Sequence, residues 1–128
     1  MARTAEDIEA YLGKLERHFE RAPDGTLLVT SHQQPPIAVR VVPPVVVFQI
    51  AIGELPRKPD AEMASLFRRL LELNAGDLMH SAFGIAGGQV YLTSALELDN
   101  LDINEVEAVL ADMSLALAQH VGELRQLV

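Results

Sequence analysis

A pair of adjacent glycines, Gly87-Gly88, constrains the fold of this chain more than any other feature of the sequence. A two-residue glycine loop between apolar runs is typical of a tight β-hairpin, and it fixes which residues face one another across the two strands. In that register Phe83 faces Leu92, and Ile85 faces Val90. These four side chains then share one side of the hairpin, so the hydrophobic pattern agrees with the register set by the turn.

On the other side of the hairpin Tyr91 faces Gly84, where its ring can cover a backbone that has no side chain. The same glycines also resemble a phosphate-binding loop. Phosphate loops, however, run from a strand into the N-terminus of a helix, whereas this one runs into a second strand. We therefore interpret these glycines as turn and packing residues.

The segments around the hairpin alternate between helical and extended patterns. Apolar residues at steps of three and four predict three helices: from Thr4 to a turn at 22–25, from Asp60 as the cap to a stop at 74–76, and from Asp102 to Leu127. The second helix is expected to turn inward Met63, Leu66, Phe67, Leu70 and Leu71. Thr4 with Asp7, and Asp102 with Glu105, are typical of capping boxes.

Period-two patterns bounded by proline or glycine predict strands at 26–31, 37–42 and 45–53, with a polar turn at 32–36 between the first two. Together with the hairpin they give the order α-β-β-β-α-β-β-α. The sequence therefore predicts an α+β fold, an antiparallel five-stranded sheet packed with three helices, in a single domain spanning 1–128.

The predicted strand at 45–53 differs in kind from the others. Its even positions are apolar, but so are Val45, Val47 and Ala51 among the odd ones. An antiparallel strand with one solvent-exposed face should alternate apolar and polar residues. We therefore expect this strand to be covered on both sides, by a helix of the same chain or by another chain. Val45, Val47 and Ala51, with Tyr91 of the neighbouring hairpin, are therefore the candidate protein-binding residues, in a dimer or with a client.

The charge balance excludes several classes of partner. There are 18 acidic against 10 basic residues, for a formal charge of -8. Such a surface repels phosphate backbones and anionic lipid, so no nucleic acid and no membrane is expected as a partner. No apolar run approaches the roughly 20 residues of a membrane span. The first residues carry acid where a signal peptide needs basic residues, so we expect a cytoplasmic protein.

No motif in the sequence predicts a reaction, a cofactor or a metal site. The chain has no cysteine, and its four histidines lie far apart. His120 lies on the apolar stripe of the last helix and is expected to be a packed or partly exposed structural residue. The acids from Glu97 onward lack the ligand spacing and the glycine of a calcium loop. They form either a solvated negative face or a dock for a basic partner. No serine has a GxSxG context, so we expect no enzyme.

Four stretches carry a resemblance to a known family: GELP at 53–56, LLELNA at 70–75, FGIAGGQVYL at 83–92 and LELDNLDINEVEAVLADM at 96–113. With the order of elements, they resemble the CesT-like superfamily of type III secretion chaperones and the related YbjN-type domain proteins. The resemblance extends from about Ile8 to Leu124. It implies a small, acidic, cytoplasmic homodimer without catalytic residues.

Secretion chaperones of this kind hold the N-terminal segment of an effector in extended form against apolar patches and sheet edges, by strand addition and side-chain pockets. The resemblance therefore implies a non-catalytic protein-binding module that holds a client segment on an apolar sheet surface. Two alternatives stay open: a YbjN-like regulator or adaptor, and a small-ligand-binding protein with a pocket between helix and sheet. The prolines at 35, 36, 43 and 44 interrupt the first strands, which leaves the position of the free sheet edge open.

Overall fold

The structure, a computed structural model, describes residues 1–31 and 33–127. Residue 127 is described by its backbone alone. The elements follow one another as α1 (Ala5–Lys14), β1 (His18–Arg21), β2 (Leu27–Ser31), β3 (Gln34–Val42), β4 (Val45–Glu54), α2 (Asp60–Gly76), β5 (Ala82–Ala86), β6 (Gln89–Glu97) and α3 (Ile103–Leu127). The described strands form one antiparallel sheet in the order β1-β2-β3-β4-β6-β5. The predicted α+β fold is confirmed, with six strands in place of the predicted five.

The sixth strand arises because the first helix is shorter than the sequence pattern indicates. Helix α1 begins with the predicted capping box, in which Thr4 Oγ1 accepts the Asp7 N–H at 3.3 Å and Asp7 Oδ2 accepts the Thr4 N–H at 2.8 Å. The helix ends at Lys14 with Leu15 as its C-cap, and Glu16 adopts a left-handed φ of 57° that turns the chain back into β1. Phe19 fits the steps of a helix and the alternation of a strand equally well, so periodicity alone could not place this boundary.

Two further boundaries differ from the prediction. Strand β3 begins at Gln34, so the prolines at 35 and 36 lie inside the strand; His32 of the predicted turn is outside the described residues. These prolines fall where the β2–β3 register shifts, and there a missing N–H costs no regular ladder bond. Asp60 is the first residue of α2 and not its cap, since the N-cap position belongs to Pro59.

The hairpin and the start of the last helix agree with the sequence interpretation. Strands β5 and β6 pair with Phe83 opposite Leu92 and Gly84 opposite Tyr91, as the Gly87-Gly88 turn predicts. Both turn glycines have positive φ, at 56° and 77°, which an L side chain rarely adopts. At the start of α3, Asp102 Oδ1 accepts the N–H of Glu105 at 2.9 Å.

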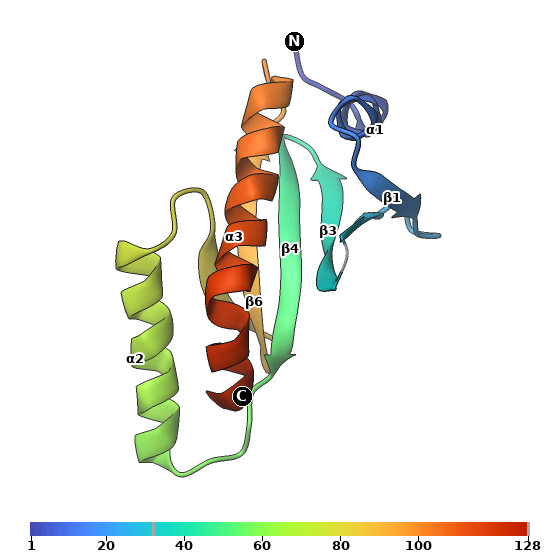
Figure 1. Ribbon diagram of the computed structural model, residues 1–128. Helices are drawn as coiled ribbons and strands as arrows, with labels where there is room; N and C mark the ends of the chain where they lie inside the picture. Colours follow the sequence, from blue (N-terminus) through green and yellow to red (C-terminus); the bar gives the residue numbers. More distant parts are fainter. Residues whose placement is uncertain (32, 128) are drawn as a thin grey trace.

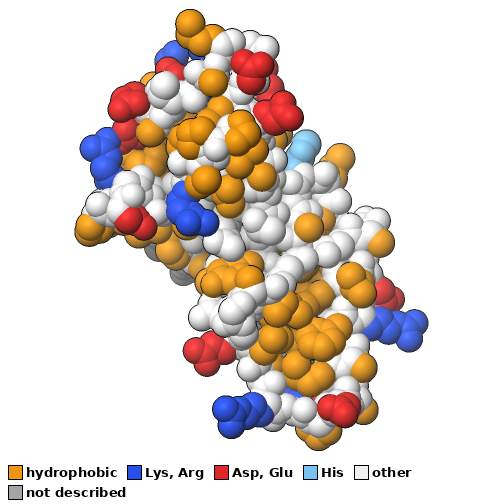
Figure 2. Space-filling model, turned by 180° about the vertical axis from the view of Figure 1, so that it is seen from behind, with side chains coloured by type: hydrophobic (Ala, Val, Ile, Leu, Met, Phe, Trp, Pro, Cys, Tyr) orange, Lys and Arg blue, Asp and Glu red, His pale blue; other side chains and the backbone are white. Residues whose placement is uncertain are grey.

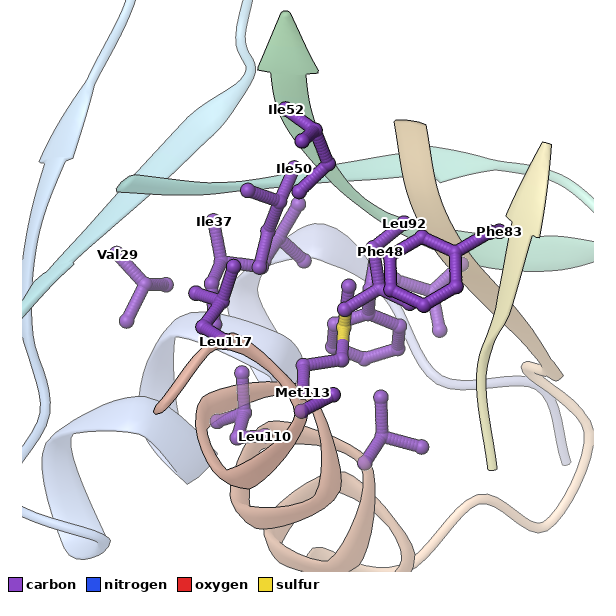
Figure 3. Packing of buried hydrophobic residues seen from close by; sticks show 14 of the residues in the cluster. Val29, Ile37, Phe48, Ile50, Ile52, Phe83, Leu92, Leu110, Met113 and Leu117 are labelled. Atoms are coloured by element: carbon purple, nitrogen blue, oxygen red, sulfur yellow. The ribbon is translucent and has the colours of Figure 1, made fainter. Parts of the chain in front are cut away.

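All three helices pack on one face of the sheet, with α3 along the central strands and α2 beside it (Figure 1). The inward positions of β4 are fully or almost fully buried: Val46, Phe48, Ile50 and Ile52. In Figure 3 the sheet side chains Phe48, Leu92 and Phe83 face Leu110, Met113 and Leu117 of α3. The core therefore lies in a single layer between the sheet and the helices.

This arrangement predicts losses of stability of very different size for two neighbouring residues of β4. Phe48→Ala leaves a cavity in the core and should lower the free energy of unfolding by about 3–5 kcal/mol. Val47→Ala, on the face away from the helices, should lower it by less than about 1 kcal/mol. Urea unfolding of both variants measures the difference. Equal losses would contradict the one-sided core.

Candidate protein-binding surface

The face of the sheet that points away from the helices is not covered by any described helix (Figure 2). Strand β4 presents Val45 and Val47, half-buried, and Ala51, exposed, on this face. Tyr91 of β6 lies on the same face, directly beside Ala51 in the β4–β6 register. The four residues predicted from the sequence therefore share one surface. The helices of the described chain supply only one of the two covers that the sequence predicts for this strand.

Apolar side chains on this open face are grouped around the first half of β4. The β3–β4 and β4–β6 registers place Val42 beside Val45, and Ala95 beside Val47. Val42 is 47% exposed, although it is a large aliphatic side chain. Figure 2 shows hydrophobic side chains in two main areas of this face, with polar and backbone atoms between them.

Opposite charges flank the apolar group on the two neighbouring strands. Arg40 of β3 lies beside Val47, and Glu97 of β6 lies beside Val45. Both charged residues are exposed. An apolar centre with a charged rim is the usual composition of a non-obligate protein interface.

A second apolar surface lies between α2 and the edge strand β5. It surrounds a hollow of about 290 Å³ and includes three large exposed side chains, which we call the α2 strip: Phe67 at 38%, Leu71 at 68% and Ile85 at 46% exposure. The sequence interpretation turned Phe67 and Leu71 inward, and this is wrong, because α2 buries Leu66, Leu70 and Leu73 instead. The spacing of Leu73 from Leu70 could have shown that α2 carries two apolar stripes.

The end of α2 is fixed to β5 by a side chain whose role the sequence interpretation missed. Asn74 Oδ1 accepts the N–H of Phe83 at 2.7 Å, and Asn74 Nδ2 donates to the carbonyl of Phe83 at 3.0 Å. The sequence marked Asn74 only as part of a helix stop. Its partner lies in another element, so no local pattern could have indicated the contact.

Two polar contacts join α2 and its C-cap to α3. Arg69 Nε donates to Glu123 Oε1 at 2.7 Å, and Arg69 Nη2 donates to Glu123 Oε2 at 3.2 Å. The hydrogen bond from Arg69 lowers the pKa of the Glu123 carboxyl below its ordinary value. His120, which is 7% exposed, has Nε2 at 3.3 Å from Asp77 Oδ2. His120 is thus packed against α2, as its place on the apolar stripe predicts.

The hollow beside α2 offers few free polar groups to a small ligand. In the hollow beside α2 the polar side chain is that of Asn74, and both of its polar atoms already bind Phe83. Among residues 1–31 and 33–127, no group of three or more His, Cys, Asp or Glu is placed to hold a metal ion. None of the described helices combines the length and apolar character that crossing a membrane requires.

The family model CesT_Tir_1 matches residues 1–128 of the chain. The chain belongs to the CesT_Tir_1 family. No curated protein sequence matches it. Three solved structures show the same fold as this CesT_Tir_1 chain. One is a chain of the heterodimeric ExoU–SpcU complex from the type III secretion system of Pseudomonas aeruginosa, with a TM-score of 0.68 and 17% identity over 94% of this chain and 97% of that one.

The second is YbjN from E. coli, with a TM-score of 0.71 and 9% identity over 98% of this chain and 94% of that one. The third is a chain from the structure of the Yersinia pestis type III secretion chaperone SycH in complex with a stable fragment of YscM2, with a TM-score of 0.59 and 15% identity over 94% of this chain and 99% of that one. At such identities the likeness concerns the fold alone. The resemblance to secretion chaperones and YbjN proteins is thereby confirmed for family and fold.

The contact between Arg69 and Glu123 predicts a pH-dependent contribution to stability. Because the folded-state pKa of Glu123 is lowered, its contribution is present above the unfolded-state pKa and is lost as the pH falls through the folded-state pKa. Glu123→Gln should therefore cost less than about 1 kcal/mol at neutral pH, since the pair is partly exposed. The cost should vanish on acidification.

Urea unfolding of the wild type and of Glu123→Gln between neutral and acidic pH measures this dependence. Glu107→Gln, which changes an exposed carboxylate on the same helix, is the control. A loss that persists at low pH would show that Glu123 acts through packing and not through its charge.

Proposed function

We propose that the chain is a non-catalytic, single-domain binding protein that holds a client segment on the open face of its sheet, as a secretion chaperone does. The observation that carries this proposal is the apolar outward side of β4, which no described helix covers. Val45, Val47 and Ala51 of β4, with Tyr91 of β6, form the contact residues. The CesT_Tir_1 match and the chaperone complexes with the same fold support it.

The arrangement of side chains indicates what kind of segment fits. Aliphatic groups at Val42, Val45 and Val47 reward apolar client residues, at about 25 cal/mol for each Å² removed from water. Arg40 and Glu97 on either side favour a client with opposite charges flanking its apolar residues. The formal charge of -8 additionally speeds the approach of basic segments.

A second copy of the chain is the partner that we propose for the α2 strip, which makes the protein a homodimer. On the outer side of α2, Arg68 Nε and Glu72 Oε1 lie 3.6 Å apart, one helical turn from each other. If two α2 helices pack antiparallel, Phe67 meets Leu71 of the partner subunit, and Arg68 meets Glu72 of the partner subunit. The same patch then serves both copies, as a two-fold interface requires.

A YbjN-like adaptor is the second candidate. The TM-score of YbjN, 0.71, is above those of the two chaperone-complex chains, 0.68 and 0.59. An adaptor would use the same open face but bind a folded regulatory partner and not an extended segment. Hydrogen exchange of the client before and after binding distinguishes the two functions. The amides of an extended segment are unprotected before it binds, whereas those of a folded partner are already protected.

The client proposal predicts that a charge on the open face abolishes binding. Each protein encoded beside the gene of this chain is co-expressed with it, and affinity is measured for any that co-purifies. Val47→Lys should weaken that affinity at least about tenfold, because it buries an unpaired ammonium in the interface. Tyr91→Ala should weaken it less, through lost apolar area.

Leu115→Lys is the matched control for this experiment. Leu115 is 56% exposed on α3, on the other side of the molecule from the open face. The same charge there should leave client affinity unchanged. Equal weakening by Val47→Lys and Leu115→Lys would contradict a site on the sheet.

The dimer proposal predicts that a charge in the α2 strip produces monomers. Light scattering of the wild type should give twice the mass of one chain. Leu71→Glu should give the mass of a single chain, because the new carboxylate and that of Glu72 from each copy would place four negative charges around the two-fold axis. Leu115→Glu on α3 should stay dimeric. A wild type that is monomeric at all concentrations would refute this part of the proposal and leave the client site untouched.

A further inference from the structure

The sheet has two edge strands, β1 and β5, and an edge strand exposes N–H and C=O groups that can pair with another strand. Only alternate residues of an edge strand turn these groups outward. The position of the hydrogen-bonded pairs therefore decides which residues of each edge are available.

On β5 the two-residue turn fixes this alternation. Ala86 and Gln89 flank the turn and form a hydrogen-bonded pair, so Gly84 and Ala82 also bond to β6. Phe83 and Ile85 consequently point their N–H and C=O groups away from β6, toward the free side of the sheet. These two residues are the places where an added strand would bond.

The carboxamide of Asn74 occupies the first of these two places. It accepts the N–H of Phe83 at 2.7 Å and donates to the carbonyl of Phe83 at 3.0 Å. This is the pair of hydrogen bonds that the backbone of a neighbouring strand would make. Ile85 then remains as a single outward position between a closed one and the hairpin turn, and an added strand cannot continue from it in either direction.

On β1 the alternation leaves two successive outward-facing residues with free backbone groups. The N–H of Ala22 donates to the carbonyl of Thr26 at 2.8 Å, and this bond sets the phase of the β1–β2 pair. Phe19 and Arg21 therefore turn their backbone groups outward. No residue of the described chain hydrogen-bonds to these groups.

We propose that Asn74 is a hydrogen-bonded stop that closes the β5 edge against strand addition. The occupant excluded from β5 is any extended strand, including β5 of a second copy. The α2 strip beside it can still bind by its side chains, because Asn74 blocks backbone pairing only. The inference concerns the sheet edge and does not depend on the proposed client site.

Hydrogen exchange of a protein that keeps the native Asn74 is the first test. In the Leu71→Glu background, which removes the proposed dimer contact, the Phe83 amide should exchange at least about tenfold more slowly than the Ile85 amide, because only Phe83 is bonded. Equal exchange of the two amides would overturn the proposal, since Asn74 would then not hold the edge closed. This test needs no change at Asn74.

The second test opens the edge with Asn74→Ala in the same background. The probe is a labelled synthetic peptide with the sequence of residues 81–87, SAFGIAG, which is a strand that this sheet already accommodates. It should bind Asn74→Ala at least about tenfold more tightly than the parent, and the particle mass should rise with concentration through β5 pairing. Asn74→Asp should gain less, because a carboxylate still accepts the Phe83 N–H and its charge repels a strand.

A proline identifies the place where the peptide binds. Ile85→Pro removes an outward N–H and no bond of the β5–β6 ladder, so it should cancel the gain of Asn74→Ala in both peptide binding and mass. The proposal would be overturned if neither Asn74→Ala nor Asn74→Asp increased peptide binding. It would also be overturned if Ile85→Pro did not cancel the increase. These readouts involve neither Val47 nor a client, so failure here is distinct from failure of the proposed function.

Discussion

The packing of β4 against α3 is the contact on which the rest of this molecule depends. Phe48 and Ile50 of the central strand are completely buried, as are Leu110 and Met113 of the 25-residue helix that crosses them. A helix of this length lies along a single face of the sheet. Because α1 and α2 also bury their apolar residues on this face, no helix of the described chain remains for the other one. The open face is therefore a consequence of how the core is built.

Helix α2 is held in place by directional contacts as much as by burial. Its inward residues pack on the sheet. The ion pair of Arg69, the contact of Asp77 with His120 and the amide pair of Asn74 determine which way the helix turns. In that orientation Phe67 and Leu71 point outward. Burial rewards any apolar residue equally, whereas hydrogen bonds demand one geometry. The polar contacts thus decide which apolar side chains stay available to a partner.

The sequence predicted best what depends on neighbouring residues. The Gly87-Gly88 turn determines its register locally, and the structure agrees with it at every pair of the hairpin. Phe19 was assigned to a helix because its spacing satisfies two periods, and only its pairing with β2 decides between them. The outward position of Leu71 and the amide contact of Asn74 depend on elements distant in the chain. Val45, Val47 and Ala51 share one face of β4 because alternation along a strand is local, whereas only the β4–β6 register places Tyr91 beside them. Their contact with a partner stays a prediction.

The two apolar surfaces hold few polar groups that are free to act on a substrate. A catalytic site needs polar groups that converge on a cavity and remain free to act on a substrate. In the hollow beside α2 the amide of Asn74 is fully occupied by Phe83, and on the open sheet face Arg40 and Glu97 stand apart on separate strands with β4 between them. Such surfaces can gain free energy only by removing apolar area from water and by matching charges at the rim. Both gains grow with the area that a partner covers, which is why the proposal assigns these surfaces to protein partners.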